Sequence, residues 1–185
     1  MPGKLRLRKL KSGSDSWLQG DKVVISADMS VLQSIRDRGN FGTIVNSNLE
    51  LSLCEALYLV ERGKIEVFDK SKRALSVNGF ARKAKEFNPR FWVRYKVYSD
   101  IRAKGYVTKA ALKYGADFSV YDRGGAPETA HSRWLLFAVS ADDSFSWREF
   151  SAMNRVAHSV KKELLIGVVD GHSDVTYYGV NWVRP

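Results

Sequence analysis

A phenol, an imidazole and an ammonium group stand where a fold could bring them together, at Tyr121, His131 and Lys162. Tyr121 ends an apolar run that is typical of a β-strand, and His131 opens the next such run after a polar loop that contains glycine. A hairpin of this kind can hold the phenol and the imidazole on one side of a sheet. A helix predicted to end near Lys162 would return the lysine to the same site. These three groups can transfer protons and stabilise negative charge, which suits phosphodiester cleavage without a metal ion.

Each of these residues taken alone also has a structural interpretation. A histidine or a tyrosine at a strand end is more often part of the packing, and a lysine at a helix end interacts favourably with the helix dipole. Two further histidines are weaker candidates. His158 is predicted on the polar side of the last helix, and His172 in a turn, where a solvated loop residue is expected. Only the arrangement of all three groups favours chemistry.

Composition favours a polyanionic partner. The chain of 185 residues has a formal net charge of +10 and 12% aromatic residues, which favours nucleic acid over a membrane surface. A basic protein without such a partner is the alternative. The single cysteine, Cys54, excludes an intrachain disulfide and a cysteine-rich zinc site. Because neither a signal peptide nor an apolar run of about 20 residues is visible, the protein is expected in the cytoplasm, with no cofactor and no membrane partner.

The first half of the chain predicts a small mixed α/β domain over residues 1–86. Capping residues define its clearest helix, because Ser52 and Glu55 have the spacing of a capping box and Gly63 provides a stop. The run at 4–11 alternates basic and apolar residues and can be an edge strand or a basic arm. The other expected elements are strands over 22–27 and 64–68, helices over 30–38 and 76–87, and a polar loop over 39–48.

The second half, residues 87–185, predicts an α/β domain with a central mixed sheet. A boundary is expected within 84–89, since Asn88 and Pro89 favour a new helix start. The final strand has apolar residues on both faces, so both faces are expected to be covered. The expected elements are helices over 90–104 and 146–162, strands over 117–121, 131–140, 164–169 and 175–183, and a turn over 170–174.

Several motifs of this half resemble the archaeal tRNA-splicing endonuclease family. Residues 95–107 (YKVYSDIRAKGYV) are similar to its Y-x-V-Y-x-D-L-R-x-R-G-Y-V stretch, and residues 115–121 (GADFSVY) to its G-x-D-F-x-V-Y strand. The pair at 131–132 resembles its His-Ser, and residues 155–164 (RVAHSVKKEL) its R-x-A-x-x-V-x-K-x-L helix. The resemblance is specific across residues 95–185 and weaker over 49–68.

The resemblance implies a catalytic triad at Tyr121, His131 and Lys162. The family cleaves precursor tRNA at bulge-helix-bulge junctions between intron and exon, without a metal ion. In that reaction a 2′-hydroxyl attacks the adjacent phosphorus and leaves a 2′,3′-cyclic phosphate and a 5′-hydroxyl. Tyr121 would take the proton of the 2′-hydroxyl, His131 would protonate the leaving oxygen, and Lys162 would stabilise the transition state.

The resemblance also implies an RNA clamp and an assembly of subunits. Arg155 matches an arginine that stacks on a bulged base, with Trp182 as a weaker second candidate; the alternative for Arg155 is an ordinary surface charge. The acidic turn with Asp170 and Asp174 matches a loop that docks on another subunit. The implied assembly is a homotetramer, or a heterotetramer with a structural subunit.

Two other functions stay open. A non-catalytic RNA-binding subunit of the same assembly would keep the fold and lose the triad, which the presence of all three residues argues against. A metal-dependent nuclease would need clustered carboxylates, and the sequence shows no convincing cluster of that kind.

Overall fold

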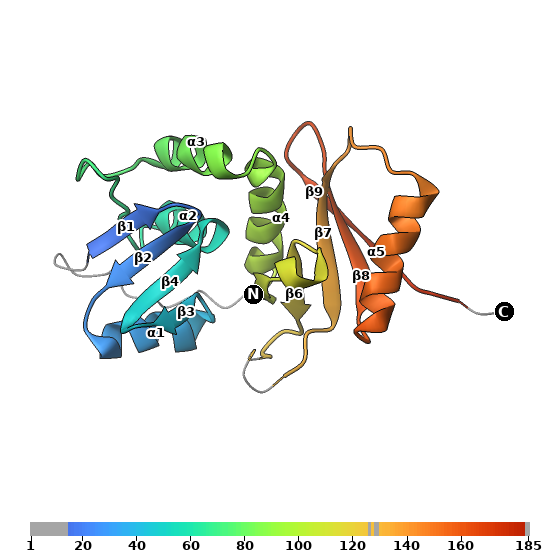
Figure 1. Cartoon of the computed structure of the whole chain (residues 1–185), viewed down its shortest axis with the longest axis horizontal. Helices are drawn as coiled ribbons and strands as arrows, with labels where there is room; N and C mark the ends of the chain where they lie inside the picture. Colours follow the sequence, from blue (N-terminus) through green and yellow to red (C-terminus); the bar gives the residue numbers. More distant parts are fainter. Residues whose placement is uncertain (1–14, 126, 128–129, 184–185) are drawn as a thin grey trace. The chain divides into compact units, whose positions relative to one another are not determined.

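The computed structural model describes residues 15–183, except for 126, 128 and 129 (Figure 1). The predicted strand or arm at 4–11 therefore lies outside the described residues. The chain forms two compact units, the first extending to Trp92 and the second beginning at Val93. Each unit combines helices with one sheet, so the predicted mixed α/β fold is confirmed. Among the described residues, none of the helices is long and apolar enough to cross a membrane.

The first unit is built on a four-stranded antiparallel sheet in the order β1-β2-β4-β3. Its hydrophobic side chains alternate along the central strands, and the buried ones include Val23, Ile25, Leu49 and Leu51. The helix α2 packs against β2 and β4, and its residues 53–59 are all buried. The elements are β1 (Asp15–Gln19), β2 (Lys22–Ser26), α1 (Met29–Gly39), β3 (Thr43–Val45), β4 (Asn48–Ser52), α2 (Leu53–Glu61) and α3 (Val77–Phe87).

The capping box predicted at the start of α2 is confirmed. The Ser52 hydroxyl accepts from the Glu55 backbone N–H, and the Glu55 carboxylate accepts from the Ser52 backbone N–H at 2.9 Å. The strand predicted at 22–27 and the helices predicted at 30–38 and 76–87 are confirmed as β2, α1 and α3.

The prediction of a polar loop at 39–48 is wrong. Residues 43–52 form the hairpin of β3 and β4, joined by a two-residue turn at Asn46 and Ser47. Both turn residues have positive φ values, 47° and 61°, as a type I′ turn requires. Because neither is a glycine, the sequence lacks the usual signal for this turn.

The strand predicted at 64–68 is also wrong. Within it only Phe68 pairs, in isolated bridges with Trp17 of β1 and with Ala74. The Phe68 carbonyl accepts from the Leu18 N–H, and the Phe68 N–H donates to the Ser16 carbonyl. The chain then turns at Asp69, whose carboxylate accepts from the backbone N–H groups of two following residues.

The second unit has a five-stranded mixed sheet in the order β5-β6-β7-β8-β9. Strands β7 and β8 are parallel, and the other neighbouring pairs are antiparallel. The helices α4 and α5 lie on opposite faces of this sheet (Figure 1). The elements are α4 (Phe91–Ala103), β5 (Val107–Ala110), β6 (Phe118–Tyr121), β7 (Trp134–Ser140), α5 (Trp147–Ser159), β8 (Glu163–Val169) and β9 (Val175–Val180).

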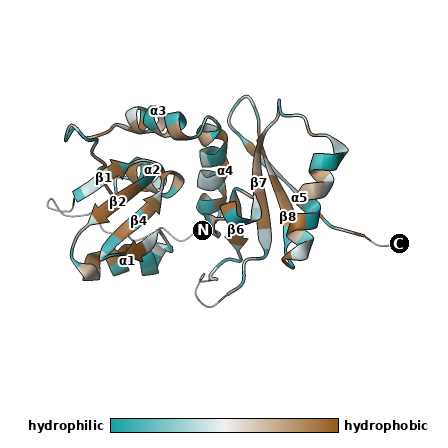
Figure 2. Cartoon of the chain, viewed as in Figure 1, coloured by the Kyte–Doolittle hydropathy of each residue, from teal (hydrophilic) through white to brown (hydrophobic). Residues whose placement is uncertain are grey.

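Both faces of this sheet are covered at its centre. On the α5 face, Leu135, Phe137 and Leu164 form a core with Ala157 of the helix. On the α4 face, Gly167 lies so close to Val97 that an added Cβ would be 2.9 Å from it. The central strands β7 and β8 are accordingly hydrophobic along much of their length, whereas α5 has a hydrophilic side (Figure 2).

The predicted end of the last helix is wrong by three residues. The helix α5 ends at Ser159, and Lys161 adopts the left-handed conformation with φ 56°. Two backbone bonds close this end, from the Lys161 N–H to the His158 carbonyl and from the Lys162 N–H to the Ala157 carbonyl. Lys162 therefore belongs to the connection into β8 and not to a helix face shared with Arg155.

Other limits of the second unit also differ from the predictions. Strand β7 begins at Trp134 and not at His131, β9 ends at Val180 and not at 183, and β5 was not predicted. The expectation that both faces of the last strand are covered stays a prediction about the assembly of subunits. On the α5 face of the edge strand β9, Val180 packs against the core, but Tyr178 is 57% exposed.

Candidate active site

The termini of three neighbouring strands lie together at one end of the second sheet. Strand β6 ends at Tyr121, whereas β7 and β8 begin at Trp134 and Glu163. The pairing register sets Val120 opposite Trp134 and Trp134 opposite Glu163. The three candidates lie in or next to these strand termini. The topology therefore brings Tyr121, the connection with His131 before β7, and Lys162 to the same end of the sheet.

A direct contact joins two of these segments. The Lys162 Nζ donates to the Ser132 carbonyl at 2.8 Å. Backbone bonds fix the next residue on both sides, because the Arg133 N–H donates to Val120 and the Arg133 carbonyl accepts from Glu163. His131 is exposed and precedes Ser132, which is buried. The imidazole is thus accessible to a ligand while the backbone behind it is held in place.

The side chain of Tyr121 belongs to the face of the sheet that α5 covers, and Lys162 lies just before β8. Leu164 packs in the α5 core, and Lys162 is two residues before it. Ser119 pairs with Leu135 of the same core, and Tyr121 is two residues after it. Since side chains two residues apart share a face of a strand, Tyr121 is directed to this side, whereas Lys162 lies in the connection before β8.

Arg133 links the same strand ends at the surface. Its guanidinium lies 3.3 Å from the Glu163 carboxylate and 3.8 Å from that of Asp122, and it stacks over the Trp134 ring at 4.4 Å. Asp122 follows Tyr121 and Glu163 follows Lys162, so the ion pairs tie the neighbours of both candidates together. The carboxylates and the guanidinium are half exposed, and such pairs contribute little to stability.

Asp117 of the motif at 115–121 has a structural position. One carboxylate oxygen forms an ion pair with the Arg94 Nε at 2.7 Å, and the other accepts from the Ala138 N–H at 2.8 Å. Both charged side chains are largely buried, with 16% and 17% exposure. These contacts fix the start of β6, the strand that ends in Tyr121.

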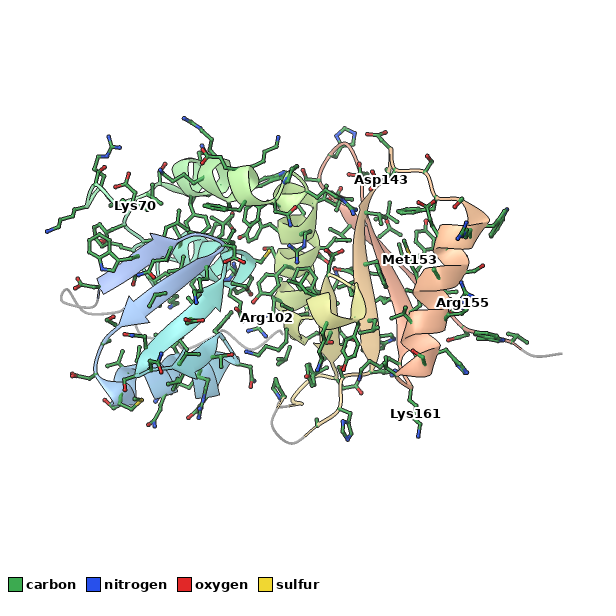
Figure 3. The ribbon with its side chains drawn as sticks, viewed as in Figure 1. Lys70, Arg102, Asp143, Met153, Arg155 and Lys161 are labelled. Carbon is green, nitrogen blue, oxygen red and sulfur yellow. The ribbon has the colours of Figure 1, made fainter. Side chains whose placement is uncertain are left out.

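The two candidates for an RNA clamp lie on and beside α5. Arg155 is exposed on this helix, whereas Met153, two residues earlier, packs against the core (Figure 3). Trp182 follows β9 and packs on His158, with the ring centroids 4.9 Å apart. Because His158 is three residues after Arg155, it is a neighbour on the helix surface. The contact of Trp182 with His158 had no signal in the sequence.

The acidic turn is remote from the candidate triad. The Asp170 carboxylate accepts from the N–H groups of His172 and Asp174, both at 2.9 Å, and all three residues are exposed. This turn follows the carboxyl end of β8, whereas Lys162 precedes its amino end. At a rise of about 3.3 Å per residue, the seven-residue strand separates them by roughly 20 Å.

The described part of the chain contains no group of three or more His, Cys, Asp or Glu side chains that could hold a metal ion. Cys54 is buried in α2.

Comparisons with known proteins assign both units to domains of one enzyme family. Residues 91–177 match the family described as tRNA intron endonuclease, catalytic C-terminal domain. Residues 15–81 match the tRNA intron endonuclease, N-terminal domain.

Curated relatives extend this similarity over most of the chain. The tRNA-splicing endonuclease of Thermococcus gammatolerans is 42% identical over 168 residues, which cover 91% of this chain and 97% of that protein. The one from Methanothermobacter thermautotrophicus is 39% identical over 90% of this chain and 96% of its own. The one from Nanoarchaeum equitans is 44% identical over 142 residues, which cover 74% of this chain and 90% of that protein. The chain belongs to the tRNA intron endonuclease family.

Proposed function

We propose that this protein is a tRNA-splicing endonuclease that cleaves precursor tRNA at the junctions of intron and exon. The contact from Lys162 to the Ser132 carbonyl carries the proposal, because it joins the lysine to the segment that bears His131. Tyr121 ends the strand on the other side of that segment. Relatives named tRNA-splicing endonuclease, similar over nine-tenths of the chain, support the same function.

The proposed reaction is a transesterification through the RNA's own 2′-hydroxyl. Tyr121 takes the proton of this hydroxyl, and the 2′-oxygen of the RNA forms a bond to the adjacent phosphorus. The bond from phosphorus to the 5′-oxygen breaks, and protonated His131 gives its proton to that oxygen. The products are a 2′,3′-cyclic phosphate and a 5′-hydroxyl, so neither water nor a metal ion enters the bond changes.

Lys162 has two roles in this scheme. Its ammonium group stabilises the negative charge that develops on the phosphoryl oxygens. A free phenol loses its proton near pH 10, so a base of this kind needs a cation nearby to favour the phenolate. The bond to Ser132 holds the ammonium group at the strand ends, where it can serve both purposes.

We also propose that Arg155 and Trp182 hold a bulged base of a bulge-helix-bulge substrate. Both side chains are exposed, Trp182 by 44%, and the helical neighbour His158 brings them to one part of the surface. A guanidinium and an indole can each stack on the face of a base.

The proposed assembly is a tetramer, made of four copies or of this chain with a structural subunit. Strand β9 is the edge of its sheet and exposes Tyr178, and an unpaired edge is a template for pairing with another chain. Asp170 and Asp174 expose carboxylates on a chain of net charge +10, which favours a basic surface on the neighbouring subunit.

Cleavage of an intron-containing precursor tRNA by the purified chain tests the proposal. In excess chelator the chain is expected to cut at both junctions, and one deoxynucleotide immediately 5′ of a scissile phosphate is expected to block that cut. Activity that is lost in chelator and restored by magnesium would indicate a metal-dependent nuclease. Binding without cleavage under every condition would indicate a non-catalytic subunit.

A pair of histidine variants tests the site. His131→Ala is expected to lower the cleavage rate by about 10²–10⁴-fold, the range for a lost proton transfer, while RNA binding is kept. If His158→Ala were the more damaging of the two for the rate at saturating RNA, the assignment of His131 would be wrong.

A further inference from the structure

The first residue of α5 exposes an indole to solvent. Trp147 is 83% exposed, more than any other large hydrophobic side chain in the described ranges. Its ring meets the Phe150 ring edge to face at 5.9 Å, and Phe145 just before the helix is 42% exposed. An exposed aromatic group of this size is a feature of binding surfaces.

A capping box fixes the position of this indole. The Ser146 hydroxyl accepts from the Glu149 N–H, and the Glu149 carboxylate accepts from the Ser146 N–H at 2.8 Å. These hydrogen bonds lower the pKa of the Glu149 carboxyl below its usual range, so it is ionised and engaged in the cap at neutral pH. Trp147 therefore stands on an ordered helix start and not on a loop.

Helix geometry aligns Trp147 with the proposed clamp. At about 100° per residue, Trp147 and His158 are three turns apart and within about 20° of one line along α5. Ser151 and Arg155 lie between them along the helix, within about 80° of the direction of Trp147 around the helix axis. All four residues are exposed. Together with Trp182, which packs on His158, they form an exposed strip about 16 Å long, here called the α5 strip.

Charge indicates which partner fits the α5 strip. Arg155 lies within it, and Arg148 and Lys161 are exposed near its ends. The nearest carboxylates in the sequence at the Trp147 end are Asp142, Asp143 and Glu149, and those of Asp143 and Glu149 accept backbone hydrogen bonds. An aromatic group among guanidinium and ammonium groups suits single-stranded RNA, whose bases stack on indoles and whose phosphates are neutralised by cations.

We propose that Trp147 is a stacking site for an unpaired RNA base, separate from the one at Arg155 and Trp182. This inference rests on the proposed function, because precursor tRNA supplies the base. The α5 strip then holds the RNA at two points about 12–16 Å apart along the helix, with Trp147 at one end and Arg155 and Trp182 toward the other. Stacking on Trp147 would keep the RNA aligned with the clamp at Arg155 and Trp182, and Trp147 would not touch the reacting atoms.

Binding of precursor tRNA to the full chain tests the proposal. Trp147→Ala is expected to weaken binding by about 5- to 150-fold, the range for the loss of one base on an aromatic ring. Trp147→Phe is expected to keep most of the affinity, and the cleavage rate at saturating RNA should be unchanged in both variants. Leu112→Ala is the matched control, because Leu112 is 70% exposed on the short 3-10 helix Leu112–Tyr114 of the same unit.

A chemical footprint separates RNA from a protein partner. The chain has one cysteine, and Cys54 is buried, so Trp147→Cys introduces a single accessible thiol. Alkylation of this thiol is expected to be fast in the free protein and slowed by saturating RNA, whereas a thiol at Leu112→Cys should not be protected. Slow alkylation before RNA is added would show that a subunit covers Trp147, and would overturn the proposal.

The remaining outcomes are also distinct. If the wild-type chain binds precursor tRNA and Trp147→Ala binds it equally well, the stacking site is refuted and the proposed function stands. If the wild-type chain neither binds nor cleaves precursor tRNA, both fail together.

Discussion

The ion pair of Arg94 and Asp117 should be the most sensitive polar contact of the second unit. Removing one partner of a buried ion pair costs about 3–5 kcal/mol, because the other charge stays in a poorly hydrated place. Both side chains keep some exposure, 16% and 17%, which places Asp117→Ala near the lower limit, at about 3 kcal/mol. For a chain of this size that free energy corresponds to a fall in Tm of about 6–12 °C.

Thermal melts followed by circular dichroism on the full chain measure this effect. Asp122→Ala is the matched control: it also removes a carboxylate from an ion pair with an arginine, but that side chain is 65% exposed and 3.8 Å from Arg133. The control is expected to change Tm by less than about 2 °C. Replacing Arg94 and Asp117 together by leucine should recover part of the loss, since no unpaired charge remains. The reasoning is refuted if Asp117→Ala melts within 2 °C of the wild type.

Three further predictions follow from other contacts. Ser146→Ala should cost about 1 kcal/mol through loss of the N-cap of α5, measured as a lower Tm, with an unchanged cleavage rate at saturating RNA below the transition. Burial and the hydrogen bond to Asp100 raise the pKa of Tyr177, so the folded state keeps this proton at a pH where the unfolded chain releases it. The free energy of unfolding, measured by chemical denaturation, should therefore fall as the pH rises above about 10, and it should fall less steeply for Tyr177→Phe. Changing both Asp170 and Asp174 to lysine should yield smaller, poorly active species by light scattering, and a fully active monomer would contradict the proposed assembly.

Local signals in the sequence located many elements of the fold. Ser52 with Glu55 forms the capping box that was predicted, and Ser146 with Glu149 forms another, because this interaction depends on residues three positions apart. The apolar run at 131–140 predicted a strand, which the structure has as β7, and its residues 135–139 are all buried.

Predictions were wrong where the backbone adopts a conformation that is unusual for the residue type. Asn46 and Ser47 make a tight hairpin turn with positive φ, and Lys161 ends α5 in the left-handed region where glycine is usual. The segment at 64–68 has the composition of a strand, but only Phe68 finds a pairing partner. Such outcomes depend on tertiary contacts, which a single sequence does not contain.

The candidate site was predictable in its residue types, but its geometry depends on the sheet. Tyr121, His131 and Lys162 were identified from their chemistry and from motifs, whereas the bond from Lys162 to the Ser132 carbonyl depends on the parallel pairing of β7 and β8. The proposed role of Trp147 has no motif behind it and follows from its exposure on the folded helix.

The left-handed Lys161 is what makes this geometry possible. A helix that continued through Lys162 would carry its side chain around the helix axis, in step with Arg155. The closure at Lys161 instead ends the helix one turn early and turns the chain directly into β8. Lys162 then precedes a strand parallel to β7, where its ammonium group reaches across to the Ser132 carbonyl. Arg155 stays on the helix surface, so the same short segment separates a group suited to the reaction from a group suited to holding RNA.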